Sequence, residues 1–386
     1  MLSRRELLER STLLALAPAT SAFRPRAADG RVLVVLQLDG GNDGLNTVVP
    51  YADELYHRFR PKLALAADKV LKLSDTLGLH PGLAGFARLL ERDRLAIVQG
   101  VGYPEPNRSH DVSQLIWQTA RFEREEHKGH GWLGRAFDGA GALPRGVPAF
   151  VLAGNEQAPH ALFARRAVCA TMNTLDEYAA ADFGPLDGPT EGDSNEEFVR
   201  RTAREAESTV ARLQALTRRD GGAKYPASEL ARRLELVAQL LKAGLETPVY
   251  YVLQRGYDTH FLQLDAHAEL LTRLGNALEA FQSDLEASGL GERVLVLVTS
   301  EFGRRVEENA SMGTDHGAAA PVFLLGRGVR PGLHGVHPRL EDLDAGDLKW
   351  TVDFRAVYAS VLEGWLGIDS EATLGGRFAP LDLLKA

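Results

Sequence analysis

The stretch "RVLVVLQLDGGNDGLN", residues 31–46, decides the fold, because a run of apolar residues ends at an acid and then at a glycine-rich turn. The chain contains further short apolar runs, "RLAIVQ" (94–99), "AFVLAG" (149–154), "PVYYVL" (248–253), "RVLVLV" (293–298) and "PVFLLG" (321–326). Most of these runs are continuous rather than alternating. This pattern predicts strands that are covered on both faces, as in a parallel sheet.

Helical patterns lie between the apolar runs. Residues 265–285 place their apolar side chains on one helical stripe, and Gly289 and Gly291 then end the helix. The alternation predicts an α/β fold with a doubly wound, mostly parallel sheet sandwiched by helices. Residues 181–196 are rich in Gly, Pro and acids and predict a surface loop. A helical insertion at about 194–245 follows, which could equally be part of the main helical layer.

The first 28 residues predict an export signal rather than a part of the fold. They have a basic start and an apolar stretch at 11–23, which is shorter than the roughly 20 residues needed to span a bilayer. Arg4 and Arg5 match the twin-arginine pattern. The alternative is an amphipathic N-terminal helix.

We therefore divide the chain into a signal peptide at 1–28 and an α/β domain at 29–386. We expect a periplasmic or secreted protein that meets the twin-arginine translocase during export. We expect no integral membrane segment in the mature chain, because no other stretch is long and apolar enough to span a membrane.

Charge and cysteine content exclude several classes of function. The net charge of -8 argues against a nucleic-acid partner, because phosphate binding needs a basic face. Cys169 is the only cysteine, which excludes both an intramolecular disulfide and a zinc site built on thiolates. Any metal ion must therefore be held by histidines and carboxylates.

Polar residues gather where the predicted strands end. In open parallel sheets, ligands bind beyond the carboxyl ends of the strands, so these residues are expected to share one edge. Four of the runs are followed by candidate residues, which are Asp39 after 31–38, Ser109 and His110 after 94–99, Asp258 and His260 after 248–253, and Glu301 after 293–298. Asp315 and His316 stand just before the last run, 321–326.

Several of these residues have the chemistry of metal ligands. Asp258 and His260 form an Asp-x-His pair that can reach one divalent cation, although Asp258 could instead cap the next helix. Asp315 and His316 lie in "GTDHG", which has too many small residues for a stable helix, and a metal ion would explain why this pair is held in a loop. Glu301 alone would be an ordinary strand-end acid.

The glycine-rich turn after the first run also has two interpretations. Asp39 could begin a turn, because "DGGNDG" favours positive φ. The glycines around Gly41 could also let backbone N–H groups approach an anion. Asn42 and Asp43 are either binding residues or turn formers.

The segment "NRSH" at 107–110 offers a nucleophile and an anion-binding group. Ser109 could be only the N-cap of the following helix. A hydroxyl at a helix N-terminus nevertheless lies in positive potential, which favours an alkoxide and an incoming anion. Arg108 suits a phosphate or sulfate because its guanidinium can bond two oxygens, and Asn107 and His110 are supporting polar groups.

These motifs together resemble a known family. The matching segments are "GGNDGLNTVVPY", "LHPGL", "NRSH", "GWLGR", "YDTH", "TSEFGR", "GTDHG" and "DFRAVY", spread over about residues 31–365. They resemble the domain-of-unknown-function family fifteen-oh-one, which comprises twin-arginine-exported bacterial proteins and is similar to the alkaline phosphatase and sulfatase superfamily. The resemblance implies an alkaline-phosphatase-like α/β fold with one or two divalent metals above the sheet.

The superfamily pattern carries over in part. The resemblance implies that the first-strand ligand is Asp39, the nucleophile Ser109, the middle pair Asp258 and His260, and the final ligand His316. The spacing of the middle pair is shorter than usual. Where the superfamily has a late Asp-His pair, this chain has Glu301 and Phe302, and a phenylalanine cannot bind a metal. Asp39 and Glu301 could bind a second, oxygen-preferring ion near Ser109, although Phe302 supplies no ligand to it.

These observations predict a metal-dependent hydrolase of phosphate or sulfate esters that acts on a small anionic ester substrate. Zinc is the favoured cofactor, with calcium, magnesium or manganese as alternatives. The competing interpretation is a non-catalytic exported binding protein on the same fold that has lost part of the metal site. An intramolecular phosphoryl-transfer mutase is weaker, because nothing marks a second phosphate clamp.

Overall fold

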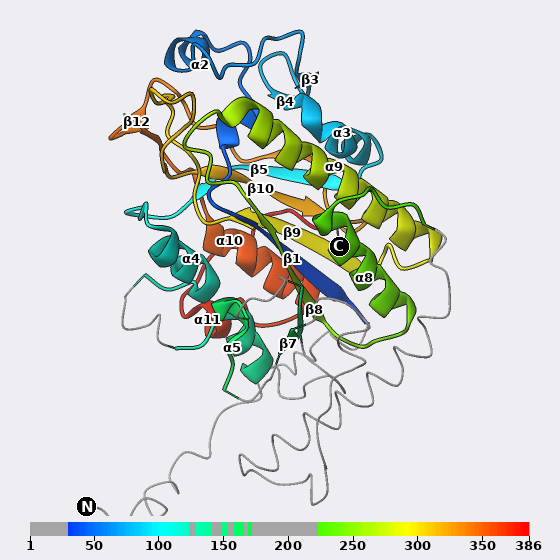
Figure 1. Ribbon diagram of the computed structural model, residues 1–386. Helices are drawn as coiled ribbons and strands as arrows, with labels where there is room; N and C mark the ends of the chain where they lie inside the picture. Colours follow the sequence, from blue (N-terminus) through cyan, green and yellow to red (C-terminus); the bar gives the residue numbers. More distant parts are fainter. Residues whose placement is uncertain are drawn as a thin grey trace, which may run out of the picture.

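The computed structural model describes residues 30–122, 129–139, 149–152, 158–165, 169–171 and 223–385. Each apolar run of the sequence forms a strand of one central sheet, as predicted (Figure 1). The order of strands across the sheet is β11 (Gly332–His334), β5 (Leu95–Gly102), β10 (Ala320–Leu325), β9 (Val294–Ser300), β1 (Val32–Asp39), β8 (Val249–Arg255), β6 (Ala149–Leu152) and β7 (Ala170–Thr171). The short strand β14 (Val352–Asp353) also pairs with β5.

The sheet is mixed but mostly parallel. Strand β1 runs parallel to both β8 and β9, and β6 runs parallel to β7 and β8. Strand β10 is the exception, because it runs antiparallel to both β5 and β9. The start of β10 therefore lies at the same edge of the sheet as the carboxyl ends of β1, β5, β8 and β9.

Two helical layers cover the two faces of the sheet (Figure 1). Val34 and Leu36 of β1 pack into the cluster that includes α3 (Ala84–Glu91), α8 (Glu229–Lys242) and α9 (Gln263–Ala287). Leu33 and Val35 point to the opposite cluster, with α4 (His110–Thr119), α5 (Trp132–Gly139), α10 (Phe354–Ala359), the π-helix η6 (Ser360–Leu366) and α11 (Ser370–Leu374). Because both faces are buried, the apolar runs are continuous rather than alternating.

The described part of the predicted insertion belongs to the main helical layer. Helix α8 packs against α9 and β8, so it covers the sheet like its neighbours. Residues 194–222 lie outside the described residues, as do residues 1–28, so the predicted insertion and signal peptide remain predictions. Within the described ranges, no helix is both long and apolar enough to cross a membrane.

Smaller elements build up the carboxyl edge beside the glycine-rich turn. They are η2 (Gly44–Asn46), β2 (Val48–Val49), α2 (Glu54–Phe59), β3 (Leu71–Lys72), β4 (Gly78–Leu79), η3 (Pro81–Leu83), β12 (Leu343–Asp344) and β13 (Asp347–Leu348). The short helix η5 (His160–Leu162) instead packs against α4 and α5. Strands β2, β4 and β3 form a separate small sheet. A third apolar cluster, which includes Leu45, Tyr56 and Leu340, holds this region together.

Candidate metal centre

Three imidazoles face one carboxylate oxygen at the carboxyl edge of the sheet. The Nε2 atoms of His260 and His316 each lie 3.0 Å from Oδ1 of Asp258, and Nε2 of His110 lies 3.4 Å from the same oxygen. One ligand atom from each of His110, Asp258 and His316 can be chosen so that all three lie within 4.8 Å of one another. The residues come from the loop after β8, the start of α4 and the loop before β10. We call His110, Asp258, His260 and His316 the histidine cluster.

The other nitrogen of each imidazole in the histidine cluster faces an oxygen that can only accept a hydrogen bond. The Nδ1 contacts are His110 to Glu301 Oε1 at 2.8 Å, His260 to Asp315 Oδ1 at 3.1 Å and His316 to the carbonyl oxygen of Arg108 at 2.7 Å. An acceptor at Nδ1 keeps the proton on that nitrogen. In the neutral ring, the Nε2 lone pair then points into the cluster.

The histidine cluster therefore holds more acceptors than donors. The Nε2 atoms of His260 and His316 are only 2.9 Å apart, and two lone pairs cannot form a hydrogen bond with each other. Nε2 of His110 is buried without a hydrogen-bond partner among the described residues. A cation at this point would hold these atoms together. Imidazole nitrogens with one carboxylate are the donor set of zinc, and acceptors behind each ring are the outer partners that metal-bound histidines use.

Arg304 fixes the carboxylate of the histidine cluster. Its buried guanidinium donates to Asp258 Oδ1 at 2.7 Å and to the backbone carbonyls of Tyr257 and Thr314 at 2.9 Å. Burial alone would raise the pKa of Asp258, but the hydrogen bond and the positive charge of Arg304 oppose this effect, and the pKa is held well below its usual range. The sequence analysis missed Arg304, because an arginine is rarely buried and no local pattern marks one that is.

Two further carboxylates, those of Glu301 and Asp39, lie beside the histidine cluster. Glu301 is buried and accepts from the backbone N–H of Gly40 at 2.9 Å, and its Oε2 lies 3.2 Å from the Ser300 hydroxyl. The side-chain amide of Gln114 donates to Asp39 Oδ1 at 2.5 Å and lies 3.3 Å from Glu301 Oε1. Burial, followed by the charge of Glu301, raises the pKa of Asp39.

Gln114 was also absent from the sequence-based predictions. It stands four residues after His110 on α4, and this spacing puts both side chains on the same face of the helix. That spacing is the signal that could have found it. Asp39 is further flanked by Arg255, whose Nε lies 3.4 Å from Asp39 Oδ2.

The glycine-rich turn after β1 lies against the site, but two of its predicted binding residues face the scaffold. Asp43 is buried, pairs with Arg60 at 2.6 Å and also accepts from the side-chain amide of Gln263. The amide oxygen of Asn42 lies 3.0 Å from Nε2 of His267. Within the structure, the side chains of Asn42 and Asp43 therefore hold the turn in place.

Gly41 allows this turn to approach the aromatic ring of Phe302. Its φ is +77°, and a Cβ added there would lie 2.3 Å from that ring. Phe302 is buried, and its ring centroid lies 4.9 Å from that of His110 and 4.8 Å from that of His316. An apolar ring thus packs where the family resemblance places a histidine ligand.

Ser109 stands at the N-terminus of α4, next to the histidine cluster. It is exposed, and its side chain makes no capping hydrogen bond; its backbone N–H donates to Oδ1 of Asn107 at 2.8 Å. Arg108 donates through Nε to Asp347 Oδ2 at 2.8 Å, and Asp347 is buried. Of the residues predicted from the sequence, the structure brings His110, Asp258, His260 and His316 together, with Glu301, Asp315 and Arg108 directly behind the rings.

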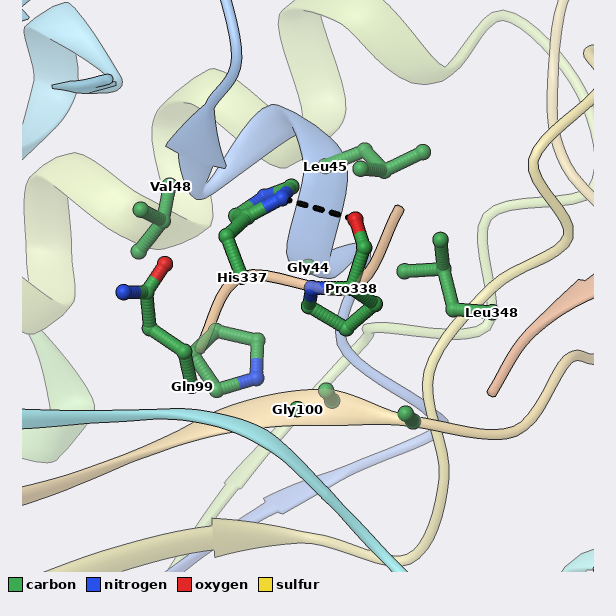
Figure 2. A pocket seen from close by; sticks show the side chains of 11 residues that line it. Gly44, Leu45, Val48, Gln99, Gly100, His337, Pro338 and Leu348 are labelled. Atoms are coloured by element: carbon green, nitrogen blue, oxygen red, sulfur yellow. Dashed lines mark hydrogen bonds between the residues drawn. The ribbon is translucent and has the colours of Figure 1, made fainter. Parts of the chain in front are cut away.

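A small recess lies behind the glycine-rich turn (Figure 2). It measures about 20 Å³, and its walls include Gly44, Val48, Gln99 and His337. The amide oxygen of Gln99 is buried there without a hydrogen-bond partner among the described residues. His337 Nδ1 lies 3.0 Å from the Pro338 carbonyl oxygen, the contact dashed in Figure 2. The recess suits a single water molecule and is too small for an ester substrate.

The chain belongs to the family described as a protein of unknown function (DUF1501), whose model matches residues 31–377. This match confirms the resemblance drawn from the short motifs. No curated protein matches the chain.

Several solved structures are similar to the chain. The PsFucS1 sulfatase from Pseudoalteromonas sp. is 11% identical at a TM-score of 0.43, covering 91% of this chain and 70% of the sulfatase. A protein in the alkaline phosphatase superfamily from Vibrio parahaemolyticus is 9% identical at a TM-score of 0.43, covering 98% of this chain and 78% of that one. The C-terminal periplasmic domain of EcEptC from Escherichia coli, in complex with Zn, is 10% identical at a TM-score of 0.41, covering 78% of this chain and 74% of that domain.

Proposed function

We propose that this protein is an exported, metal-dependent hydrolase of phosphate or sulfate esters. The observation that carries the proposal is the convergence of three imidazole Nε2 atoms on Asp258 Oδ1, with an oxygen acceptor behind each ring. This arrangement suits a divalent cation, because the Nε2 atoms and Asp258 Oδ1 have few hydrogen-bond donors around them. Zinc is the favoured ion, because the ligands are mainly imidazoles.

The group that attacks the ester in this proposal is the hydroxyl of Ser109. It is exposed at the N-terminus of α4, where the helix dipole favours negative charge. Ser109 Oγ loses its proton to solvent and forms a bond to the phosphorus or sulfur atom while the bond to the leaving oxygen breaks, and that oxygen takes up a proton and leaves as the alcohol. Water then hydrolyses the serine ester, which frees the phosphate or sulfate and restores the hydroxyl of Ser109. When bound, a divalent ion lowers the pKa of a hydroxyl or water beside it.

Arg108 would bind the anionic oxygens of the ester. It is about 41% exposed and is oriented by its ion pair with Asp347. The backbone N–H groups of Gly40 and Asn42, on either side of Gly41, donate to Glu301 and to the Ser300 hydroxyl, so this part of the turn supports the site and does not bind the ester. The substrate class that fits Arg108 is a small anionic ester. The predicted twin-arginine signal supports a periplasmic or secreted location.

The experiment uses the folded, exported chain. Its metal content is measured, and it is then assayed against phosphate and sulfate mono- and diesters. We expect turnover of at least one ester class, and we expect Ser109→Ala to lower kcat by at least about 100-fold while the metal is retained. Ser109→Thr is the matched control, because it keeps a hydroxyl at the same position. Unchanged turnover in Ser109→Ala would exclude this nucleophile.

A second function is favoured by one specific observation. Phe302 is buried against the rings of His110 and His316, where the family resemblance calls for a ligand. A chain that keeps the histidine cluster without turnover would be an exported binding protein in which the ion holds a ligand. Tight metal binding with no hydrolysis of any ester in the panel would favour this function over the hydrolase.

A further inference from the structure

We propose that the chain binds a single divalent ion, in the histidine cluster, and that the side-chain amide of Gln114 takes the place of a second ion between Asp39 and Glu301. This inference deepens the proposed function by giving the number of ions and the role of each carboxylate. It makes His110 a metal ligand and makes Glu301 the positioning residue behind it.

The position of the Gln114 amide is the first argument. Its Nε2 atom is 2.5 Å from Asp39 Oδ1 and 3.3 Å from Glu301 Oε1. A primary amide has two N–H donors, so one nitrogen can serve both carboxylates. A cation bridging Asp39 and Glu301 would have to lie between the same two oxygens. The amide therefore fills this position and supplies the positive ends of its N–H dipoles instead of an ionic charge.

The hydrogen bonds of Glu301 are the second argument. Its Oε1 accepts from the backbone N–H of Gly40 at 2.9 Å and contacts His110 Nδ1 at 2.8 Å, in addition to the Gln114 contact. Its Oε2 lies 3.2 Å from the Ser300 hydroxyl, whose shorter hydrogen bond, at 2.7 Å, goes to the backbone carbonyl of Leu38. The oxygen that faces Asp39 and His110, Oε1, is thus fully used by the protein. Such a carboxylate behind a histidine fixes the ring and raises the basicity of its far nitrogen, as outer partners of metal ligands do.

The environment of His110 is the third argument. With Nδ1 held by Glu301, its Nε2 faces the histidine cluster and lacks a hydrogen-bond partner among the described residues. Nε2 lies 3.4 Å from Asp258 Oδ1, and its ring centroid is 4.3 Å from that of His316. His110, on α4, would thus be a fourth ligand. It would compensate for Phe302, which stands where the superfamily's late Asp-His pair has its histidine.

The stoichiometry of metal binding tests this inference without any assay of turnover. The full exported chain is stripped with a chelator and titrated with Zn²⁺ by calorimetry, and the bound metal is counted by mass spectrometry after dialysis. We expect one equivalent in the wild type. Two equivalents in the wild type, or none, would overturn the inference.

The variant Gln114→Glu sharpens the test, because it replaces the two N–H donors with a third carboxylate beside Asp39 and Glu301. We expect it to bind a second equivalent. Gln118→Glu is the matched control, since it places the same change one turn further along α4, where the amide contacts Gln37 at 3.1 Å. We expect one equivalent in the control. A single equivalent in Gln114→Glu, with the variant folded by circular dichroism, would count against the placement of the amide.

Two further variants separate a ligand from a positioning residue. His110→Ala should weaken Zn²⁺ binding by at least 100-fold, whereas Glu301→Gln should weaken it by about 10- to 100-fold and keep one equivalent. The visible absorption bands of the cobalt(II)-loaded protein should show four-coordinate metal in Glu301→Gln and an altered coordination in His110→Ala. Unchanged affinity in His110→Ala would overturn its role as a ligand. Absence of turnover with all of these results intact would refute the hydrolase and leave this inference standing.

Discussion

Two clusters of histidine, aspartate and arginine lie at the same edge of the sheet, and they differ in whether their hydrogen-bond acceptors have donors. The side chain of Asp43 is fully buried against Arg60 at 2.6 Å. The side chain of Asp258 is 49% exposed and faces three imidazoles as well as Arg304. Around Asp43 each acceptor has a donor, whereas around Asp258 the acceptors outnumber the donors.

The difference teaches that residue types alone do not define a site. Burial lowers the pKa of His267, near Asp43, to about 3, so this imidazole is neutral and serves the scaffold. In the histidine cluster, oxygen acceptors hold the proton of each ring on Nδ1 and leave the Nε2 atoms facing one another. Several Nε2 lone pairs that face one another, one of them buried without a hydrogen-bond partner among the described residues, are the feature that suits a cation.

The largest effect is expected from Asp43→Asn. This change leaves the guanidinium of Arg60 buried without its partner charge, which should lower the free energy of unfolding by about 3–5 kcal/mol. Denaturant unfolding of the metal-free chain measures it. Asp53→Asn is the control, because it changes the N-cap of α2 to another residue that caps well. A loss below about 1 kcal/mol would mean that the two clusters are energetically alike.

A smaller effect, in a different observable, is expected from Asp258→Asn. The substitution removes the carboxylate charge that all three Nε2 atoms face, so Zn²⁺ affinity should fall by at least about 100-fold, or roughly 2.7 kcal/mol. The free energy of unfolding of the metal-free chain should fall by less than in Asp43→Asn, because Arg304 is buried like Arg60 but Asp258 itself is half exposed. Calorimetric titration and unfolding in chelator give the two values. Undiminished affinity would remove Asp258 from the metal centre.

Acid should destabilise the buried cluster before the carboxylates titrate. The folded-state pKa of His267 is lowered to about 3, below its unfolded value of about 6.5. The unfolded chain therefore binds a proton that the folded chain does not, and stability falls as the pH drops below about 6.5. The slope for one proton is about 1.4 kcal/mol per pH unit, or roughly 2 kcal/mol by pH 5.

The comparison that isolates this slope is between the wild type and His267→Gln, both in chelator. The variant keeps a side-chain donor for Asn42 but cannot titrate, so its stability should depend less on pH between 7 and 5. The other histidines are common to both proteins and cancel. Parallel pH profiles would show that His267 is not buried as a neutral ring.

The smallest effect is expected from Asp315→Asn. The side chain of Asp315 is 57% exposed and contacts His260 Nδ1 at 3.1 Å, behind the ring. Losing its charge should weaken Zn²⁺ binding by about tenfold, at the low end for an outer partner. Asp342→Asn, at an exposed ion pair with Lys349, is the control. A loss as large as that of Asp258→Asn would instead make Asp315 a ligand.

The sequence by itself determined that the strands are buried on both faces and that polar residues follow them. Continuous apolar runs such as 31–38 require cover on both sides, and the residue after a strand necessarily lies at the edge of the sheet. Asp39, Asp258 and Glu301 could therefore be predicted at one edge. The position of His316 at that edge depends on something more, because it precedes its strand rather than following it.

The tertiary structure alone decided the direction of β10 and the partners of each polar group. His316 reaches the site because β10 runs antiparallel to both neighbours, a direction that no apolar period encodes. Asp43 became a scaffold residue because Arg60 folds back onto it, and Gln114 meets Asp39 across 75 residues of chain. The physical reason is that periodicity records which face of an element is buried, whereas hydrogen-bond partners and exposure depend on which distant elements pack together.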